Sequence, residues 1–387
     1  MKRIKIIRII ARLNIGGPAI HTTLLTKGLD AKRFESILVS GRPEPNEGDM
    51  SYLAKEMGLK TRFISGLRRS IGLRDIKAFW QIFNYIRREK PDIVHTHTAK
   101  AGTLGRIAAI LAGVPIKVHT FHGHTFHNYF GTKATSLFLF VERILARFTD
   151  KTITLSKGQF EEICYKFNVT SPYKTSIIPL GFDLKPFLEC ETKKGLLRAR
   201  LGIKKEERLV GIIGRPVPVK NHALFLHAAR RILDRKKNVR FLMVGGERLP
   251  ENMKVLCEEL KLGDRLIFLG WERDMSVIYA DLDVVGLTSL NEGTPVSLIE
   301  AMASAKAIVA TDVGGVKDIV RHGVRGYLVP SQDTAAFADA TIELLNNGHL
   351  AREFGSNGRE FAKKNFSKER LEEDTEHLYQ KLVMSKL

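Results

Sequence analysis

Hydrophobic residues in the first half of the chain come in short aliphatic runs separated by longer segments of helical spacing. Residues 3–11, 34–40 and 92–97 are such runs, and their length fits buried strands. Between them, segments such as 73–90 repeat apolar residues every three or four positions, as an amphipathic helix does. Buried strands that alternate with helices predict a parallel sheet covered on both faces.

The same alternation begins again near residue 208. Residues 208–215 predict a strand and residues 221–235 a helix, and further strand–helix pairs follow. We therefore expect an α/β protein with two doubly wound, Rossmann-like domains, residues 1–185 and 186–367, facing each other across a cleft. The last helix, residues 368–387, has no strand after it and is expected to pack back on the first domain.

Length and composition agree with two ordinary domains. The chain has 387 residues, of which 44% are hydrophobic, and this suffices for two cores. No run approaches the roughly 18 apolar residues that span a membrane, and the basic start is interpreted as a strand because it lacks a signal-peptide cleavage site. Three widely spaced cysteines, Cys164, Cys190 and Cys257, are typical of reduced thiols in a cytoplasmic protein.

The charge is the unusual global property. The chain has 62 Lys and Arg against 42 Asp and Glu, a formal net charge of +20. Residues 1–190 hold 30 basic and 15 acidic residues, a net +15, so only +5 remains for the rest. A basic first half favours an anionic lipid surface or a diphosphate-bearing substrate, although general solubility needs no partner. Nucleic acid is disfavoured because aromatic residues are not interleaved with the cations.

Two carboxylates flank a Thr-Pro pair in the stretch NEGTPVSLIEAM. Thr294 is a favoured N-cap, and Pro295 suits the first helical position. Glu292 is then expected in the loop ahead of the helix, and Glu300 about a turn and a half inside it. The free N–H groups of the first turn would bind an anion while the carboxylates bind hydroxyls, as a nucleotide-sugar requires. The plainer interpretation is one solvated loop acid and one surface acid.

Two cations lie in the loop GRPVPVKN, directly after the strand that begins the second domain. Arg215 offers a planar fork for two phosphate oxygens, and Lys220 offers a compact charge. In the first domain, the adjacent Gly16 and Gly17 would let backbone N–H groups approach a diphosphate. Taken alone, either loop could be an ordinary solvated turn, and the glycine pair matches neither the dinucleotide motif nor the P-loop.

Four histidines lie within nine residues after the strand near residue 116: His119, His122, His124 and His127. They suggest zinc, but no Cys or carboxylate lies nearby in the sequence, and a strand-to-loop path would scatter the side chains. A polar pocket wall for a sugar is the better interpretation. Asp281 and Asp283 resemble a metal-binding Asp-x-Asp pair, but they precede a strand, so we expect them at a helix end and a strand start.

Together these segments resemble glycosyltransferase family 4, whose members have the GT-B fold. The most specific part is GWERDMSVIYADLDVVGLTSLNEGTPVSLIEAM, which holds the family's Glu-x7-Glu signature as Glu292 and Glu300. Further matches, in the family's order along nearly the whole chain, are NIGGPAIH, DIVHTHTAKAGTLGRIAA, VHTFHGH, GRPVPVKN and VGGERL. The chain looks most like bacterial enzymes that build capsular, exopolysaccharide or other lipid-linked glycans.

The resemblance implies a role for each candidate residue. Glu300 would hold the donor ribose, Glu292 the transferred sugar, and His122 would contact that sugar near the reacting carbon. Arg215 and Lys220 would bind the diphosphate, and with His122 and Glu292 they form the implied catalytic set. The implied donor-binding residues are Gly16, Gly17, Gly214, Arg215, Lys220, Gly245, Glu292, Gly293, Thr294, Pro295, Val296 and Glu300.

The resemblance also implies the reaction and the partners. The family retains anomeric configuration and needs no metal or other cofactor. The expected reaction is sugar transfer from a nucleoside-diphosphate sugar, with UDP as the expected nucleotide, to a lipid-linked or saccharide acceptor in cell-surface glycan synthesis. We expect a cytoplasmic enzyme held on the inner face of the plasma membrane by its basic first half. Residues 136–148 are one candidate contact, with core packing as the alternative.

Two other functions stay open at this point. A GT-B-fold nucleotide-sugar epimerase is the rival enzyme, and it would need acid and base carboxylates but no acceptor. A basic nucleic-acid-binding protein is the more distant alternative.

Overall fold

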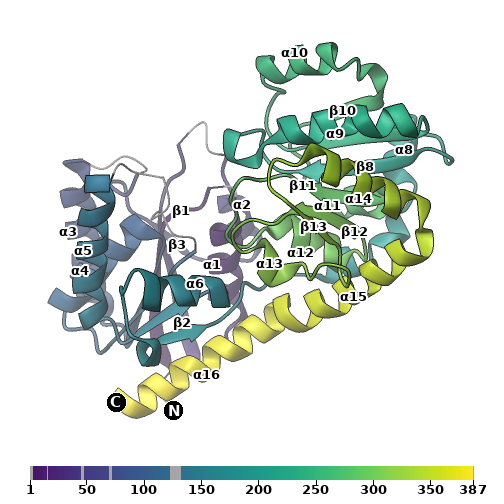
Figure 1. Cartoon of the computed structure of the whole chain (residues 1–387). Helices are drawn as coiled ribbons and strands as arrows, with labels where there is room; N and C mark the ends of the chain where they lie inside the picture. The colour runs from purple at the N-terminus through teal and green to yellow at the C-terminus, as the bar shows by residue number, and fades with distance from the viewer. Residues whose placement is uncertain (1–2, 15, 45–47, 69–71, 123–131, 387) are drawn as a thin grey trace. The chain divides into compact units, whose positions relative to one another are not determined.

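The computed structural model describes residues 3–14, 16–44, 48–68, 72–122 and 132–386. The chain divides into two compact units (Figure 1), of which unit 1 comprises Met1–Phe182 together with Ser367–Leu387, and unit 2 comprises Asp183–Phe366. Unit 2 is therefore inserted between the two parts of unit 1, and the chain passes twice from one unit to the other.

Unit 1 is built on a seven-stranded sheet of order β3-β2-β1-β4-β5-β6-β7, in which every pairing is parallel. The strands are β1 (Ile4–Arg12), β2 (Phe34–Gly41), β3 (Thr61–Phe63), β4 (Ile93–His97), β5 (Ile116–Thr120), β6 (Lys151–Thr154) and β7 (Thr175–Ile177). The helices are α1 (Gly17–Gly28), α2 (Ser51–Glu56), α3 (Arg74–Glu89), α4 (Ala99–Leu111), α5 (Thr132–Phe148), α6 (Lys157–Glu161) and α16 (Lys368–Lys386).

Alternate side chains of the strands point to opposite faces of this sheet, and helices cover both faces. On one face Ile7 and Val94 pack with the buried residues of α3 and α4, and α5 lies beside α4 (Figure 1). On the other face Ile6 packs with α1 and with Leu371 and Tyr379 of α16. The C-terminal helix is thus part of the core of unit 1.

Unit 2 is built on a six-stranded sheet of order β10-β9-β8-β11-β12-β13, also parallel at every pairing. Its strands are β8 (Arg208–Ile213), β9 (Val239–Val244), β10 (Leu266–Leu269), β11 (Val284–Leu287), β12 (Ala307–Thr311) and β13 (Tyr327–Val329). Its helices are α7 (Lys185–Leu188), α8 (Leu196–Leu201), α9 (His222–Arg235), α10 (Glu251–Glu259), α11 (Met275–Asp281), α12 (Val296–Ala303), α13 (Val316–Ile319), α14 (Thr334–Asn346) and α15 (Gly348–Phe366).

Two long helices of unit 2, α14 and α15, were not expected from the sequence. The prediction has no element between β13 and the last helix, whereas the structure has α14 and α15 there. Phe337 and Leu345 of α14 and Phe354 of α15 are buried in the core that also holds Phe225 and Phe241. These helices therefore cover the sheet of unit 2.

Each sheet has a point where the winding of the chain reverses. In unit 1 this point lies between β1 and β4, and in unit 2 between β8 and β11. Ligands of open parallel sheets bind beyond the carboxyl ends of the strands at such a point. The loops after these four strands are therefore the places to look for a site. Within the described part of the chain, no helix is long and apolar enough to cross a membrane.

Candidate functional site

Lys220 and Glu292 follow the neighbouring strands β8 and β11 and meet beyond their carboxyl ends. Lys220 Nζ lies 2.5 Å from Glu292 Oε1, and Ser289 Oγ donates to the same oxygen at 2.6 Å. The Glu292 side chain is 11% exposed and that of Lys220 is 26% exposed. A charge-assisted bond in a partly buried setting fixes both groups, so neither is a freely solvated loop residue.

Glycines bring the loops after β8 and β9 close together. Gly245 has a φ of 115°, and a Cβ at this position would lie 3.0 Å from the carbonyl of Gly214. Gly214 has a φ of 153°, and a Cβ there would meet only the stem of Lys220, at 3.7 Å. Both backbone conformations favour glycine. Arg215 follows Gly214 with an exposed side chain.

The helix after Glu292 starts differently from the predicted capping pattern. Pro295 occupies the N-cap position with a φ of −71°, no side chain caps the helix, and Val296 is its first residue. The prediction of Thr294 as N-cap with Pro295 inside the helix is therefore wrong. The carbonyl of Pro295 accepts from the backbone N–H groups of Leu298 at 3.1 Å and Ile299 at 3.4 Å, which are the first bonds of the helix. The amides of Val296 and Ser297, the first two of the helix, still lack intrahelical acceptors.

A second loop holds the backbone around Glu292 and Gly293. The N–H of Gly315 donates to the carbonyl of Glu292 at 2.9 Å. A Cβ at Gly315 would lie 1.8 Å from the carbonyl oxygen of Gly293, and one at Gly314 would lie 2.1 Å from that of Glu292. These two glycines were not singled out from the sequence, although the adjacent pair after β12 is a visible signal.

Glu300, one turn inside α12, has a perturbed carboxyl group. Burial raises its pKa from 4.5 to about 7, although a hydrogen bond from Tyr279 opposes the rise. The Tyr279 hydroxyl lies 2.9 Å from Glu300 Oε2 and 2.9 Å from the carbonyl oxygen of Ser297. The single hydroxyl proton of Tyr279 can be donated to only one of these two oxygens at a time. Tyr279 was not predicted from the sequence.

Gly16 and Gly17, which were expected in the loop after the first strand, lie at the start of the first helix. Gly16 is the N-cap residue of α1 with a φ of 155°, and a Cβ there would meet only Pro18, at 3.7 Å. The backbone at Gly16 is therefore open to a close approach. Farther along, α1 carries the buried His21.

Three histidines of unit 1 converge from α1, from the end of β4 and from the residues after β5. His97 Nδ1 lies 2.9 Å from His122 Nε2, and the ring centroids of His21 and His122 are 5.0 Å apart. Burial lowers the pKa of His122 to about 3 and those of His21 and His97 well below the usual value. The imidazoles are thus neutral at pH 7. Among the described residues, one buried ring nitrogen of each has no hydrogen-bond partner.

This trio could bind a metal or hydrogen-bond a polar ligand. Its ligand atoms lie within 4.8 Å of one another, and neutral imidazole is a zinc ligand. However, the trio includes no carboxylate, and the buried Arg8 adds a positive charge that lowers the pKa of His21 and His97 after the larger effects of burial and other histidines. A nearby cation disfavours a second one, so hydroxyl groups suit this trio better than a metal ion.

The remaining histidines of the predicted cluster do not belong to the trio. His119 is fully buried, and its Nδ1 lies 2.9 Å from Thr96 Oγ1, which makes it a core residue. His124 and His127 lie outside the described residues. His21 and His97 were missed because they are distant in sequence from His122.

Asp281 and Asp283 have the structural roles predicted for them. Asp281 ends α11 and accepts from the backbone N–H of Gly195 at 2.6 Å and of Arg198 at 3.0 Å. Asp283 precedes β11 and lies 3.0 Å from both Arg198 Nη2 and Arg208 Nη1. Their oxygens are therefore occupied by protein donors.

Comparison with known proteins gives the family. Residues 15–185 match the model of Glycosyltransferase Family 4, and residues 193–361 match that of Glycosyl transferases group 1. UDP-Gal:alpha-D-GlcNAc-diphosphoundecaprenol alpha-1,3-galactosyltransferase of Escherichia coli is 32% identical over 317 residues, which cover 78% of this chain and 82% of the relative. The chain belongs to glycosyltransferase family 4.

Other relatives and solved structures agree with this assignment. The family 4 glycosyltransferase is 27% identical to CapM of Staphylococcus aureus, a capsular polysaccharide biosynthesis glycosyltransferase, over 81% of this chain and 83% of the relative. The crystal structure of HepE of Anabaena in complex with UDP has a TM-score of 0.83 at 21% identity, covering 98% of this chain and 100% of that one. The prediction of a GT-B fold with two Rossmann-like domains is confirmed.

The predicted residues thus fall into two groups. Unit 1 holds Gly16, Gly17 and His122, with His21 of α1 as the link between them. In unit 2, Lys220 bonds Glu292 and its stem lies near Gly214, while the residues from Gly293 to Glu300 form the loop before α12 and the first part of that helix.

Proposed function

We propose that this glycosyltransferase moves a sugar from a UDP-sugar to a lipid-linked or saccharide acceptor in cell-surface glycan synthesis, with retention of anomeric configuration. The observation that carries the donor assignment is the Lys220–Glu292 pair beside the amino end of α12. This arrangement places cationic and amide groups that can bind phosphate next to carboxylates that can bind sugar hydroxyls. Support for UDP comes from HepE, which was solved with UDP and with UDP-glucose. Support for a lipid-linked acceptor comes from the Escherichia coli relative.

In this proposal, Arg215, Lys220 and the first amides of α12 bind the diphosphate. Negative charge develops on the diphosphate as the glycosidic bond breaks, so groups aimed at it stabilise the transition state more than the bound donor. Lys220 then exchanges its contact with Glu292 for a phosphate oxygen, and Glu292 accepts hydroxyls of the transferred sugar. Glu300 takes the ribose hydroxyls.

His122 contacts the transferred sugar as a neutral imidazole. With a pKa of about 3, it is not an imidazolium acid at neutral pH, but its N–H can donate a hydrogen bond and its other ring nitrogen can accept one. No side chain is then needed as a base, because in the front-face retaining scheme the departing phosphate takes the acceptor's proton. The proposed reaction requires no metal and no other cofactor.

The partners follow from the acceptor and the charge. A membrane-embedded acceptor would be reached by a cytoplasmic enzyme attached peripherally to the anionic inner face of the plasma membrane. The net charge of +15 over residues 1–190 supports this attachment. Nucleic acid is not a proposed partner.

A nucleotide panel tests the donor assignment. Thermal unfolding of the wild type is measured with UDP, GDP, ADP and UDP-sugars, and repeated on Arg215→Ala, Glu300→Ala and the exposed control Lys237→Ala. UDP should raise the Tm of the wild type and the control, and raise it less in the two site variants. The donor assignment fails if none of these nucleotides moves the wild type.

Product analysis separates the transferase from an epimerase. With a UDP-sugar alone, an epimerase would produce a second UDP-sugar, whereas the proposed enzyme gives at most slow hydrolysis. Adding a polyprenyl-diphosphate saccharide should yield a longer saccharide and free UDP. Donor epimerisation without an acceptor would refute the transferase.

A further inference from the structure

Helix α5 exposes large apolar side chains, which a surface helix normally buries. Leu137, Phe140, Ile144 and Phe148 follow one another at intervals of three to four residues and are 65%, 58%, 38% and 52% exposed. Such spacing places them on one stripe of the helix. The alternative of core packing is therefore wrong for these four residues.

The charges of α5 reinforce this reversed pattern. Arg143 and Arg147 are exposed on the same helix. The acid between residues 137 and 148 is Glu142, which is buried and paired with the buried Arg106 at 2.7 Å. The outer surface of α5 is thus apolar and basic, which is typical of helices that lie at a membrane surface.

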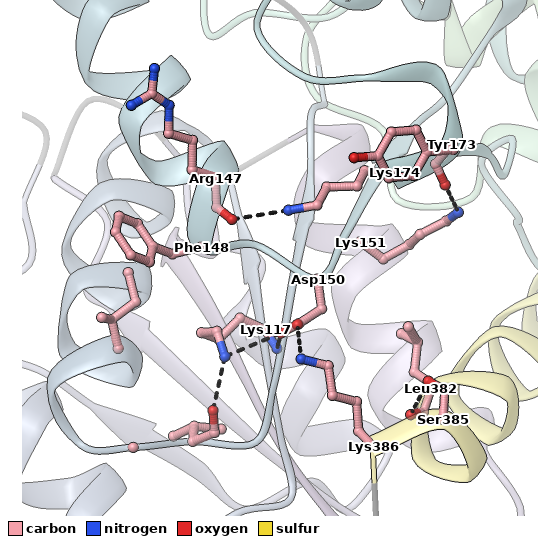
Figure 2. Close-up of a pocket in the computed structure, with 13 residues that line it drawn as sticks. Lys117, Arg147, Phe148, Asp150, Lys151, Tyr173, Lys174, Leu382, Ser385 and Lys386 are labelled. Atoms are coloured by element: carbon pink, nitrogen blue, oxygen red, sulfur yellow. Dashed lines mark hydrogen bonds and ion pairs between the residues drawn. The ribbon is translucent and has the colours of Figure 1, made fainter.

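A basic cavity lies at the C-terminal end of α5. It has a volume of about 670 Å³ and is lined by the ends of α4, α5 and α16 and by the starts of β5 and β6. Its charged residues are five cations and one acid (Figure 2): Lys117, Arg147, Lys151, Lys174, Lys386 and Asp150. With five positive charges and one negative, the lining carries a net +4. Phe148 and the 79% exposed Tyr173 also line it.

Backbone carbonyls hold these cations without neutralising them. Lys174 Nζ donates to the carbonyl of Arg147 at 2.9 Å, and Lys151 Nζ to that of Tyr173 at 2.8 Å (Figure 2). Asp150 is shared by Lys117 at 3.2 Å and Lys386 at 2.8 Å. Burial, followed by the charge of Lys381, lowers the pKa of Lys151. The lining is therefore a fixed, undercompensated positive site, which suits a phosphate.

The cavity is separate from the candidate site of unit 1. Helix α5 follows the carboxyl end of β5 and leads to the amino end of β6. His122 comes just after β5, whereas Lys151 begins β6. Because β5 and β6 run parallel, His122 lies at the carboxyl ends of the strands and Lys151 at their amino ends.

We propose that the exposed stripe of α5 and this basic cavity form a docking site for an anionic phospholipid membrane. The stripe enters the boundary of the acyl chains, and the cavity receives a lipid phosphate, with Phe148 and Tyr173 at the level of the headgroups. This inference rests on the proposed membrane association and is independent of the transfer chemistry.

Vesicle co-sedimentation tests the docking site on the full chain. Wild-type protein is mixed with phosphatidylcholine vesicles with or without phosphatidylglycerol, at low and high salt. Arg147→Glu with Lys386→Glu changes the lining from +4 to 0 and should weaken binding to anionic vesicles by about thirtyfold or more. Phe140→Ser with Phe148→Ser should weaken it by about tenfold or more. The matched control, Lys205→Glu with Lys237→Glu on the exposed surface of unit 2, should lose much less.

The outcomes separate docking from folding and from donor binding. Circular dichroism and the UDP-induced Tm shift are measured on every variant, and Arg147→Gln with Lys386→Gln replaces the charge reversal if that variant misfolds. Folded cavity variants that bind anionic vesicles like the wild type would overturn the docking site. Equal binding of the wild type to neutral vesicles, or an equal loss in the control, would also overturn it. Vesicle binding without any UDP effect would leave the docking site standing and refute the donor assignment instead.

Discussion

Lys220 is the residue whose replacement should separate catalysis from folding. Its ammonium group bonds Glu292, which also accepts from Ser289, so Lys220→Met leaves Glu292 with one protein donor. We expect kcat/KM to fall by roughly 10²- to 10³-fold, the cost of losing one group aimed at developing charge, while Tm changes little. Initial rates with a UDP-sugar and thermal unfolding measure the two effects.

The control for this variant is Lys237→Met, an exposed lysine of the same unit. It should keep the wild-type rate within about twofold. If Lys220→Met also kept that rate, the proposed role of the ion pair at the leaving group would be wrong.

Glu300 should give unit 2 a pH-dependent stability. Its folded pKa of about 7 lies above the ordinary value of 4.5, so folding favours the protonated acid. That contribution is complete below about pH 4.5 and is lost as pH rises through 7, a change of roughly 3 kcal/mol in the free energy of unfolding. Glu300→Gln should remove this slope. Urea unfolding at pH 5 and pH 8 measures it.

Because other groups titrate in the same range, the informative quantity is the difference between the wild type and Glu300→Gln. We expect the variant to gain stability relative to the wild type at pH 8 but not at pH 5. Parallel pH profiles for the two proteins would show that Glu300 is ionised at neutral pH.

At the scale of elements, the loop before α12 depends on a glycine in another loop. A Cβ at Gly315 would lie 1.8 Å from the carbonyl oxygen of Gly293, so Gly315→Ala must displace the backbone that carries Glu292. We expect the affinity for UDP to fall at least about tenfold, as misplaced groups lose their hydrogen bonds to the ligand. Isothermal titration with UDP measures this loss.

Gly348→Ala is the matched control, because its added Cβ would meet only the tip of the Arg352 side chain, at 3.4 Å. It should bind UDP like the wild type. Equal affinities for the two variants would show that the loop tolerates the shift and that the glycine pair does not position the site.

Helices and strands could be predicted from the sequence where a local hydrophobic pattern determines them. Their exact ends were harder to predict, because single residues determine them. The aliphatic runs of β1 and β8 are buried strands because both faces of their sheets are covered. The start of α12 was mispredicted by one residue. Thr294 is a favoured N-cap, but Pro295 has an extended backbone and is itself the N-cap residue, so the helix begins at Val296. The helices α14 and α15 carry helical apolar spacing, so their signal was present in the sequence and went unused.

At the scale of the whole molecule, the candidate site depends on strand order, which the local pattern does not contain. Lys220 and Glu292 are 72 positions apart and meet because β8 and β11 are neighbours in the sheet. His97 reaches His122 for the same reason, since β4 pairs with β5. Local motifs singled out Lys220, Glu292 and His122, and the family resemblance implied their roles, but neither these pairings nor the raised pKa of Glu300 could be read from the sequence.

Because unit 2 is inserted into unit 1, a fragment of the chain can contain all of unit 2 but not all of unit 1. The two units should therefore differ in their ability to fold alone. Residues 183–366 are contiguous and hold their whole sheet and core, so this fragment should fold alone and bind UDP. Residues 1–182 lack α16, whose Tyr379 hydroxyl lies 2.6 Å from His95 Nδ1 and 3.1 Å from Arg8 Nη2.

Loss of α16 should therefore unfold unit 1. Burial of Leu371 and Tyr379 contributes roughly 4 kcal/mol, a large part of the 5–15 kcal/mol that stabilises a typical domain. The buried Arg8 and His95 would each also lose one hydrogen-bond partner, the Tyr379 hydroxyl. Circular dichroism and hydrogen exchange on residues 1–182, with and without a peptide of residues 367–387, measure this dependence. A cooperative, native-like 1–182 fragment would show that the returning helix is dispensable, whereas rescue by the peptide would show that unit 1 is one fold built from both ends of the chain.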